Sequence, residues 1–414
     1  MSRSARRPLS PEAAAVVSAL RPSRRGVLAS GAALGAGALL TACGTGGSSS
    51  GKRTLTAAQD VSDSEKYVRW ANWTSYLDYD EETKVYPTLE RFQKQTGIKA
   101  TYAEDIEDND QYWGKIQGQL RNGQDIGKDI VVFTDYMAAR MIRLGYSQEI
   151  DRSVVPNAKN LLPELSDVSF DRGRKNSLTW QSGFAGLAYN KAELNKLGVK
   201  IETVSDLWNP KLKGRVEVLT EMRDTIGLIL LEQGVDVSED FSGDQWKAAV
   251  EVLRKQLDNG QVRQVKGNSY LEDLKSGAAL AVIAWSGDIF AANGEAVGDK
   301  DIEDPYEFVI PDSGGTIWSD NMLIPIGSPH RKNAEILMNY YYDPAVAAEV
   351  AAWVQYICPV QGAREAMTKV DASLVDSPFI FPDEATLKRV KVFRDLSPQE
   401  ETEFNEEFQK VLGA

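Results

Sequence analysis

A ring and a carboxylate stand together at the end of a long apolar stretch of this sequence. Trp285 and Asp288 directly follow the uncharged run 278–284. A carboxylate can bind a cation, and the face of an indole ring attracts a cation while also covering hydrocarbon. The pair therefore predicts a binding site for a cationic ligand that has apolar segments.

Three further stretches end in the same way. The stretches 67–72, 129–133 and 215–219 lead, in that order, into these side chains: Trp73, Thr74 and Tyr76; Thr134 and Tyr136; Glu221 and Asp224. In open α/β sheets, ligands bind in the crevice outside the carboxyl ends of the strands. We therefore expect the four strand ends to meet in one cleft.

Each of these residues also has an ordinary structural interpretation. Glu221 and Asp224 are three residues apart, and at the start of a helix such acids are often favourable simply because of the helix dipole. Arg223 could neutralise one of them. A tryptophan such as Trp285 is more often part of the core than of a ligand platform, and Trp73 could pack within a loop.

The elements that would position these residues alternate between strands and helices. Hydrophobic periodicity and cap residues predict strands at 67–72, 98–102, 129–133, 180–190, 215–219, 278–285 and 308–311, and helices at 80–96, 111–121, 138–144, 203–208, 224–233, 244–258 and 343–353. We expect Asp110 to cap the helix 111–121 and Gly97 to end the helix 80–96. This βαβ alternation predicts an α/β fold with mostly parallel sheets flanked by helices.

The chain length allows two lobes, each with its own core. We expect lobe 1 to comprise 66–181 plus 311–355, and lobe 2 to comprise 186–306 plus 357–414 with the C-terminal helices. The strand 180–190 and the chain near Tyr356 would cross between the lobes as a hinge.

Composition excludes some classes of function. The chain has 414 residues and a net charge of −13, and its basic N-terminus makes the remainder more acidic still. Such acidity disfavours nucleic acid and favours small cations. The single histidine, His330, is predicted to lie in a surface turn before a helix, which excludes a histidine-dependent catalytic triad and also excludes a multi-histidine metal site. We predict no metal and no cofactor.

The N-terminus is predicted to be an export signal. Residues 1–42 are basic and then apolar, with paired arginines at 24 and 25 that look like a twin-arginine signal. Leu40 to Cys43 resembles a bacterial lipobox, which implies acylation of Cys43. Residues 43–65 would form a flexible tether, so that the protein is lipid-anchored on the outer face of the cytoplasmic membrane. Cys358 is then a lone thiol, expected to be buried.

The order of these segments resembles the polyamine-binding lipoproteins of bacterial ABC importers, in the type II periplasmic binding-protein superfamily. The resemblance covers roughly residues 66–395 and rests on six motifs in order: NWTSY (72–76), DIVVFTDYM (129–137), LTEMRD (219–224), AWSGDIF (284–290), IWSDNMLIP (317–325) and YDPAVAAEVA (342–351). It implies two lobes that close on spermidine or putrescine, delivery to a membrane permease, and a monomeric protein that is not an enzyme.

The resemblance also implies a set of ligand-binding residues. They are Trp73, Thr74 and Tyr76 after the first strand, Thr134 and Tyr136 after the third, the acids Glu221, Asp224 and Asp288, the ring of Trp285, and Tyr270, Trp318, Asp320 and Tyr356. The spacing at 285–288 resembles putrescine-preferring members, whereas the acids at 221 and 224 resemble spermidine-preferring ones. The identity of the amine is left open.

Two other functions are open on the sequence alone. The same fold could bind a quaternary amine, a basic amino acid or a sugar. A quaternary amine would favour a box of rings with fewer acids, and a sugar would favour more amide and guanidinium groups. A surface hydrolase could instead use paired carboxylates, as glycosidases do.

Overall fold

The computed structural model describes residues 55–297 and 303–413, and these residues belong to one compact unit. The predicted signal (1–42) and the predicted lipid-attachment residue Cys43 lie outside the described residues. Within the described residues, no helix combines the length and the apolar composition that a bilayer span requires.

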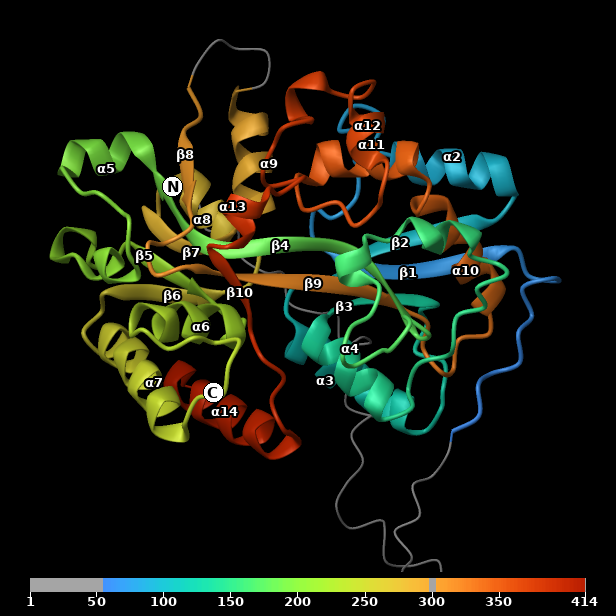
Figure 1. Cartoon of the computed structure of the whole chain (residues 1–414), viewed down its shortest axis with the longest axis horizontal. Helices are drawn as coiled ribbons and strands as arrows, with labels where there is room; N and C mark the ends of the chain where they lie inside the picture. Colours follow the sequence, from blue (N-terminus) through green and yellow to red (C-terminus); the bar gives the residue numbers. More distant parts are fainter. Residues whose placement is uncertain (1–54, 298–302, 414) are drawn as a thin grey trace, which may run out of the picture. The chain divides into compact units, whose positions relative to one another are not determined.

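Ten strands form one sheet (Figure 1). They are β1 (Tyr67–Trp73), β2 (Lys99–Ile106), β3 (Ile130–Thr134), β4 (Ser177–Asn190), β5 (Val216–Leu219), β6 (Val262–Lys266), β7 (Ala281–Trp285), β8 (Tyr306–Val309), β9 (Gly315–Leu323) and β10 (Val390–Val392). The main strand order is β2-β1-β3-β9-β4-β7-β5-β6, with β10 paired to β9 and β8 paired to β4.

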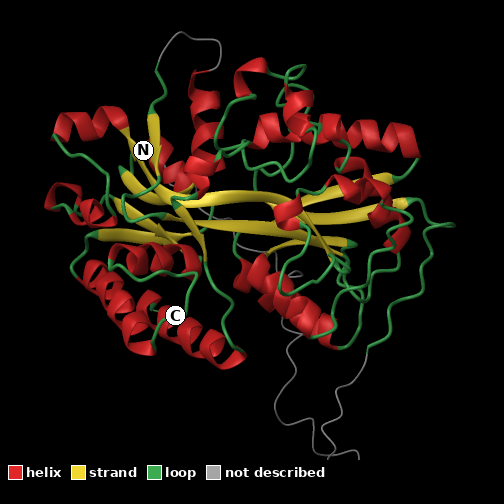
Figure 2. Ribbon diagram, viewed as in Figure 1, coloured by secondary structure: helices red, strands yellow, loops and turns green. Residues whose placement is uncertain are grey.

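Helices flank the sheet on both faces (Figure 2). The α-helices are α2 (Pro87–Thr96), α3 (Asn109–Arg121), α4 (Asp135–Arg143), α5 (Lys191–Leu197), α6 (Met222–Glu232), α7 (Gly243–Asp258), α8 (Tyr270–Ser276), α9 (Ser286–Val297), α10 (Arg331–Tyr341), α11 (Pro344–Val354), α12 (Ala363–Met367), α13 (Glu384–Leu387) and α14 (Pro398–Leu412). Short 3₁₀ helices lie at Pro156–Asn160, Pro163–Leu165, Val204–Trp208, Pro210–Leu212 and Ala372–Leu374.

Two groups of parallel strands are joined by two long antiparallel strands. β2, β1 and β3 are parallel neighbours, as are β7, β5 and β6. β9 pairs antiparallel with β3 and with β4, and the second half of β4 pairs antiparallel with β7. The alternating α/β architecture expected from the sequence is therefore confirmed, and its two parallel groups share one continuous sheet.

The central parallel strands are buried on both faces, as the uncharged run predicts. Every residue of β7 and of β5 is buried, and so are the first four residues of β3. Helices cover both faces of these strands, so apolar side chains are favoured at successive positions rather than alternate ones. Their carboxyl ends therefore carry the first side chains that are free to face a ligand.

Several predicted boundaries are wrong in instructive ways. The helix predicted from residue 80 begins at Pro87, because the preceding residues turn back in a bridge between Asp80 and Val85 and Pro87 occupies the first helical turn. It ends at Gly97 as expected, where φ is 72° and the N–H donates to the carbonyl of Gln93. The predicted helix 203–208 is a 3₁₀ turn.

The cap of α3 is Asp108, whose side chain accepts a hydrogen bond from the Gln111 N–H at 2.9 Å, rather than Asp110. The helix starts two residues earlier than predicted, so Asp110 falls inside its first turn. There its carboxylate pairs with Arg140 of α4 at 3.0 Å. The acid predicted as a cap therefore links two helices.

His330 is buried, and the prediction of a surface turn is wrong. Its Nδ1 lies 3.0 Å from Asp129 Oδ1 and its Nε2 lies 3.1 Å from Glu65 Oε2, while its ring centroid is 4.1 Å from that of Tyr67. The residue before the helix is thus fixed by side chains from distant parts of the chain. Cys358 is buried, as expected.

Residues 55–65 pack on the fold, although the sequence predicted a tether up to residue 65. Ala58 and Val61 donate backbone hydrogen bonds to the carbonyls of Ile326 and Pro329, at 3.0 and 2.8 Å. The packed part of the chain therefore begins at least eleven residues before the expected start of lobe 1 at residue 66.

Candidate functional site

The predicted strand ends meet in one cavity of about 430 Å³. Its wall includes every residue that the sequence analysis selected as a ligand contact, except Tyr270: Trp73, Thr74, Tyr76, Thr134, Tyr136, Glu221, Asp224, Trp285, Asp288, Trp318, Asp320 and Tyr356. These residues end or follow β1, β3, β5 and β7, lie on β9, or belong to the segment after α11. The convergence of four strand ends is thus observed.

Asp320 of β9 is held by two hydroxyl groups. Thr134 Oγ1 donates to its Oδ1 at 2.7 Å, and the Tyr76 hydroxyl donates to its Oδ2 at 3.0 Å. The side chain is only 3% exposed, and this burial raises the pKa of Asp320 from 3.8 to about 7. Burial disfavours the ionised form because the charge loses its hydration.

Glu221 precedes the first residue of α6 and faces α3 and α4. The Tyr136 hydroxyl donates to its Oε2 at 3.0 Å, and the backbone N–H and side-chain amide of Asn109 donate to its Oε1 at 3.1 and 3.0 Å. Burial, followed by the nearby Asp108 carboxylate, raises the pKa of Glu221 well above its ordinary value.

Asp224 lies one turn further along α6 and points to β7 and β9. The Trp285 indole N–H donates to its Oδ2 at 2.8 Å, and Thr316 Oγ1 donates to its Oδ1 at 2.8 Å. Burial raises the pKa of this carboxyl group as well. The hydrogen bond fixes the Trp285 ring relative to the acid, so that both face the cavity together.

Asp288, in the first turn of α9, accepts hydrogen bonds from three side chains. Tyr356 donates at 2.8 Å, Tyr270 at 2.9 Å and Asn268 at 3.2 Å, and burial raises the pKa of Asp288. Tyr270 is fully buried and does not line the cavity. It lies behind Asp288 and orients that carboxylate instead of facing a ligand.

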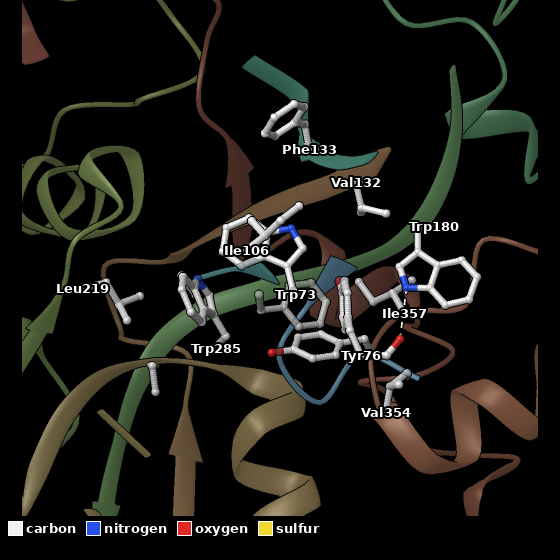
Figure 3. Packing of buried hydrophobic residues seen from close by; sticks show 14 of the residues in the cluster. Trp73, Tyr76, Ile106, Val132, Phe133, Trp180, Leu219, Trp285, Val354 and Ile357 are labelled. Atoms are coloured by element: carbon white, nitrogen blue, oxygen red, sulfur yellow. Dashed lines mark hydrogen bonds between the residues drawn. The ribbon is translucent and has the colours of Figure 1, made fainter. Parts of the chain in front are cut away.

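Aromatic rings cover the cavity between the carboxylates. The ring centroids of Trp73 and Trp285 are 6.1 Å apart, and Tyr356 contacts the rings of Tyr76 and Trp318 at 5.2 and 5.5 Å. Figure 3 shows Trp73, Tyr76 and Trp285 beside one another, with the Trp180 indole donating to the Tyr76 carbonyl at 3.2 Å. The rings come from both groups of parallel strands, from β9 and from the segment after α11.

The sequence analysis missed part of the wall. Asp135 lies between two predicted residues, Thr134 and Tyr136, and the same strand-end argument would have included it; burial raises its pKa to about 6. The segments 168–170 and 392–395 also line the cavity. Neither segment follows a strand of the two parallel groups, so the strand-end pattern in the sequence could not predict that they line the cavity.

The four acids have an unusual set of partners. Glu221, Asp224, Asp288 and Asp320 accept hydrogen bonds from neutral donors, and in the part of the chain that the structure describes none of them forms an ion pair with Lys, Arg or His. A buried carboxylate without a counter-ion is costly. The arrangement is therefore suited to a ligand that supplies the missing positive charges.

No metal centre is evident among the described residues, since no group of three or more His, Cys, Asp or Glu side chains there has the arrangement that a metal ion needs.

We expect Asp320→Asn to stabilise the ligand-free protein at neutral pH. The folded-state pKa of about 7 lies above the ordinary value of 3.8, so the native state binds the proton more tightly than the unfolded state does. Stability due to this group is present below pH 4 and is lost as the pH rises towards 7. The variant cannot ionise, and at pH 8 it should be more stable by on the order of 2 kcal/mol.

Urea unfolding of both proteins at pH 5 and pH 8, after removal of ligand, measures this effect. The advantage of the variant should be larger at pH 8. If the difference in the free energy of unfolding between variant and wild type were the same at both pH values, ionisation of Asp320 would not be its cause.

Comparison with known proteins identifies one family for this chain. Residues 88–374 match the family of bacterial extracellular solute-binding proteins. The spermidine/putrescine-binding periplasmic protein 1 of Haemophilus influenzae is 28% identical over 338 residues, which are 81% of this chain and 89% of that protein. The putrescine-binding periplasmic protein PotF of Escherichia coli is 26% identical over 329 residues, 77% of this chain and 84% of that protein.

The fold also matches solved structures. One from Listeria monocytogenes, described as a spermidine/putrescine ABC transporter, has a TM-score of 0.71 and 26% identity, and the match covers 84% of this chain and 99% of that one.

Proposed function

Because the chain belongs to the family of bacterial extracellular solute-binding proteins, we propose that it is the solute-binding component of an ABC importer and captures polyamines such as spermidine and putrescine. The two relatives named for these ligands match this chain over 89% and 84% of their own length, which supports the proposal. The chain would deliver its ligand to a membrane permease and act as a monomer, without catalysis.

The observation that carries the proposal is the set of four buried carboxylates that have only neutral hydrogen-bond donors. A polyamine is a flexible hydrocarbon chain with an ammonium group at each end. Each ammonium would hydrogen bond to a carboxylate, which contributes about 1.5–3 kcal/mol net. Burying four methylenes contributes about 0.8 kcal/mol each, and an indole face adds about 0.5–2 kcal/mol.

These contributions are of the size that micromolar binding needs. Two anchored ends, the hydrocarbon between them and one indole face sum to about 7–11 kcal/mol before ordering costs, against roughly 8 kcal/mol for micromolar affinity. Ligand charge would also relieve the buried acids, because an ammonium beside Asp320 favours its ionised form. Burial of the four acids without a counter-ion is thus electrostatically unfavourable, and a cation of matching length would supply the missing positive charge.

The proposal is tested by a thermal-shift screen of the protein without its first 43 residues. The panel contains putrescine, spermidine, spermine, choline, arginine and maltose, at concentrations from 1 µM to 1 mM. We expect the midpoint of unfolding to rise with the polyamines at the lowest concentrations. A shift with choline, arginine or maltose alone would replace polyamines with another solute, and no shift at all would leave a surface hydrolase to be tested by turnover.

We propose that the two parallel groups of strands act as lobes. Lobe 1 would be 66–181 plus 311–355 and lobe 2 would be 186–306 plus 357–414, with β4, β9 and the chain at Tyr356 between them. The acids support this division, since Asp320 and its partner Tyr76 are on one side and Glu221, Asp224 and Asp288 are on the other. When the two lobes close, the acids of both lobes would contact the same ligand molecule.

We propose that the protein is exported and held on the outer face of the cytoplasmic membrane by lipid on Cys43. Cys43→Ser removes the acylated sulfur. Since each buried methylene of a lipid chain contributes about 0.8 kcal/mol, we expect loss of the chains to release the protein from the membrane fraction. Fractionation of producing cells, followed by immunoblotting, measures this. Retention of the Ser variant in the membrane would contradict the lipid anchor.

A further inference from the structure

Two guanidinium groups line the cavity that is otherwise rich in carboxylates, and they differ in how well their charge is neutralised. Arg394 pairs with Glu400 at 2.7 Å, and its Cζ lies 4.4 Å from the ring centroid of Phe241. Arg223 has no comparably short ion pair among the described residues. The positive charge of Arg223 therefore acts on a ligand at that end of the cavity to the extent that neighbouring acids leave it unneutralised.

Arg223 lies in the sequence between two predicted ligand acids, Glu221 just before α6 and Asp224 in its first turn. Its Cζ is 3.7 Å from the ring centroid of Tyr136, whose hydroxyl donates to Glu221, and its side chain is 12% exposed. Burial raises the pKa of Asp224, and the charge of Arg223 offsets part of that rise. The guanidinium therefore acts electrostatically on the acid that would hold an ammonium group.

Arg223 also borders a second cavity, of about 320 Å³. The two cavities share the wall residues Tyr136, Ser169, Phe170, Arg223 and Asp395. The second cavity lies between α4 and the region that leads into α14. A ligand that extends past Glu221 in this direction would pass the guanidinium.

The charge of Arg223 is only partly compensated. Its Nη2 lies 3.7 Å from Glu401 Oε1, but the same carboxylate also pairs with Arg140 at 3.0 Å and with Arg143 at 3.4 Å. Arg140 has a second partner in Asp110 at 3.0 Å, but three guanidinium groups still share the single charge of Glu401. Glu401 is 6% exposed, so water screens this cluster weakly.

We propose that Arg223 is a specificity-determining residue that disfavours polyamines with more than two ammonium groups. The inference rests on the proposed polyamine-binding function. The volume of about 430 Å³ falls within the range of pockets that take drug-sized ligands, so space alone does not exclude the longer amines. A third or fourth ammonium would extend towards the guanidinium, and two like charges in a weakly screened cavity repel each other.

Arg223→Met tests the proposal, because methionine keeps an unbranched chain against the Tyr136 ring and removes the charge. Calorimetric titrations with putrescine, spermidine and spermine give the affinity ratios. We expect wild-type protein to bind putrescine more tightly than spermine. In the variant, the affinity for spermine relative to putrescine should rise at least tenfold, with spermidine in between.

Two further variants separate charge from packing. Arg223→Lys keeps the charge and should keep the wild-type ratio. Arg254→Met removes the same charge from the surface of α7, where Arg254 is half exposed and pairs with Glu251 at 3.3 Å, and should also keep the ratio. Circular dichroism and the unfolding midpoint check that each variant is folded.

The outcomes distinguish this inference from the function on which it rests. Wild-type protein that binds spermine more tightly than putrescine would overturn the inference, as would an unchanged ratio in folded Arg223→Met. An equal change in Arg254→Met would also overturn it, because the effect would then come from net charge. Failure of every polyamine to bind wild-type protein would refute the proposed function itself.

Discussion

Asp288→Asn should weaken polyamine binding about 100-fold or more. The carboxylate already has three neutral donors, from Tyr356, Tyr270 and Asn268, and it would supply the negative charge for one ammonium group. The amide keeps the size of the side chain but not its charge. Leaving a buried ammonium without its partner costs about 3–5 kcal/mol, which corresponds to a loss of more than two orders of magnitude in affinity.

The matched control is Asp78→Asn. Asp78 is also a buried acid, at 7% exposure, but it accepts hydrogen bonds from the Thr88 backbone and hydroxyl and does not line the cavity. Its replacement should leave the affinity for polyamines unchanged. Calorimetric titration of spermidine and putrescine into both variants makes the comparison. Equal affinities for wild type and Asp288→Asn would remove this acid from the site.

Trp285→Ala should have the second large effect. The ring lies 6.1 Å from that of Trp73, and its N–H fixes Asp224 at 2.8 Å, so one substitution removes an apolar platform, a cation–π partner and the orientation of an acid. The lost contacts together predict a loss of affinity of about 100-fold or more. Truncating a buried tryptophan also costs about 3–5 kcal/mol of stability.

Two variants separate the contributions of binding and stability. Trp285→Phe keeps a ring but loses the hydrogen bond to Asp224, and should retain more affinity than Trp285→Ala. Trp208→Ala removes a half-buried tryptophan away from the cavity and should leave affinity unchanged. Titrations at a temperature where each variant is folded measure these differences. Full affinity in folded Trp285→Ala would contradict the assigned role of the ring.

Local sequence patterns predicted the strand ends because parallel strands follow a simple rule. The runs before Trp73, Thr134, Glu221 and Trp285 are mostly apolar because helices cover both faces of the sheet. The carboxyl ends of these parallel strands bound the crevice in which ligands bind. The family resemblance added Trp318, Asp320 and Tyr356, which no strand-end argument reaches. These residues line the same cavity as the others.

Long-range packing limited the rest of the prediction. His330 looks like a turn residue from its neighbours, but Asp129 and Glu65 bury it. Tyr270 has the type expected of a ligand contact, yet its hydroxyl turns towards Asp288 from behind. The segment 392–395 reaches the cavity only because the chain returns there after α13, and no periodicity near those residues encodes that return.

The most direct test of the central claim is calorimetric titration of putrescine and spermidine into ligand-free protein at pH 6.5, in two buffers that differ in ionisation enthalpy. The acids with raised pKa, above all Asp320 at about 7, should lose protons when the amine binds. We predict one molecule of amine per chain, micromolar or tighter affinity, and net release of protons to the buffer. Binding without proton release would contradict the role of the buried acids, and heats of dilution alone would contradict the polyamine site.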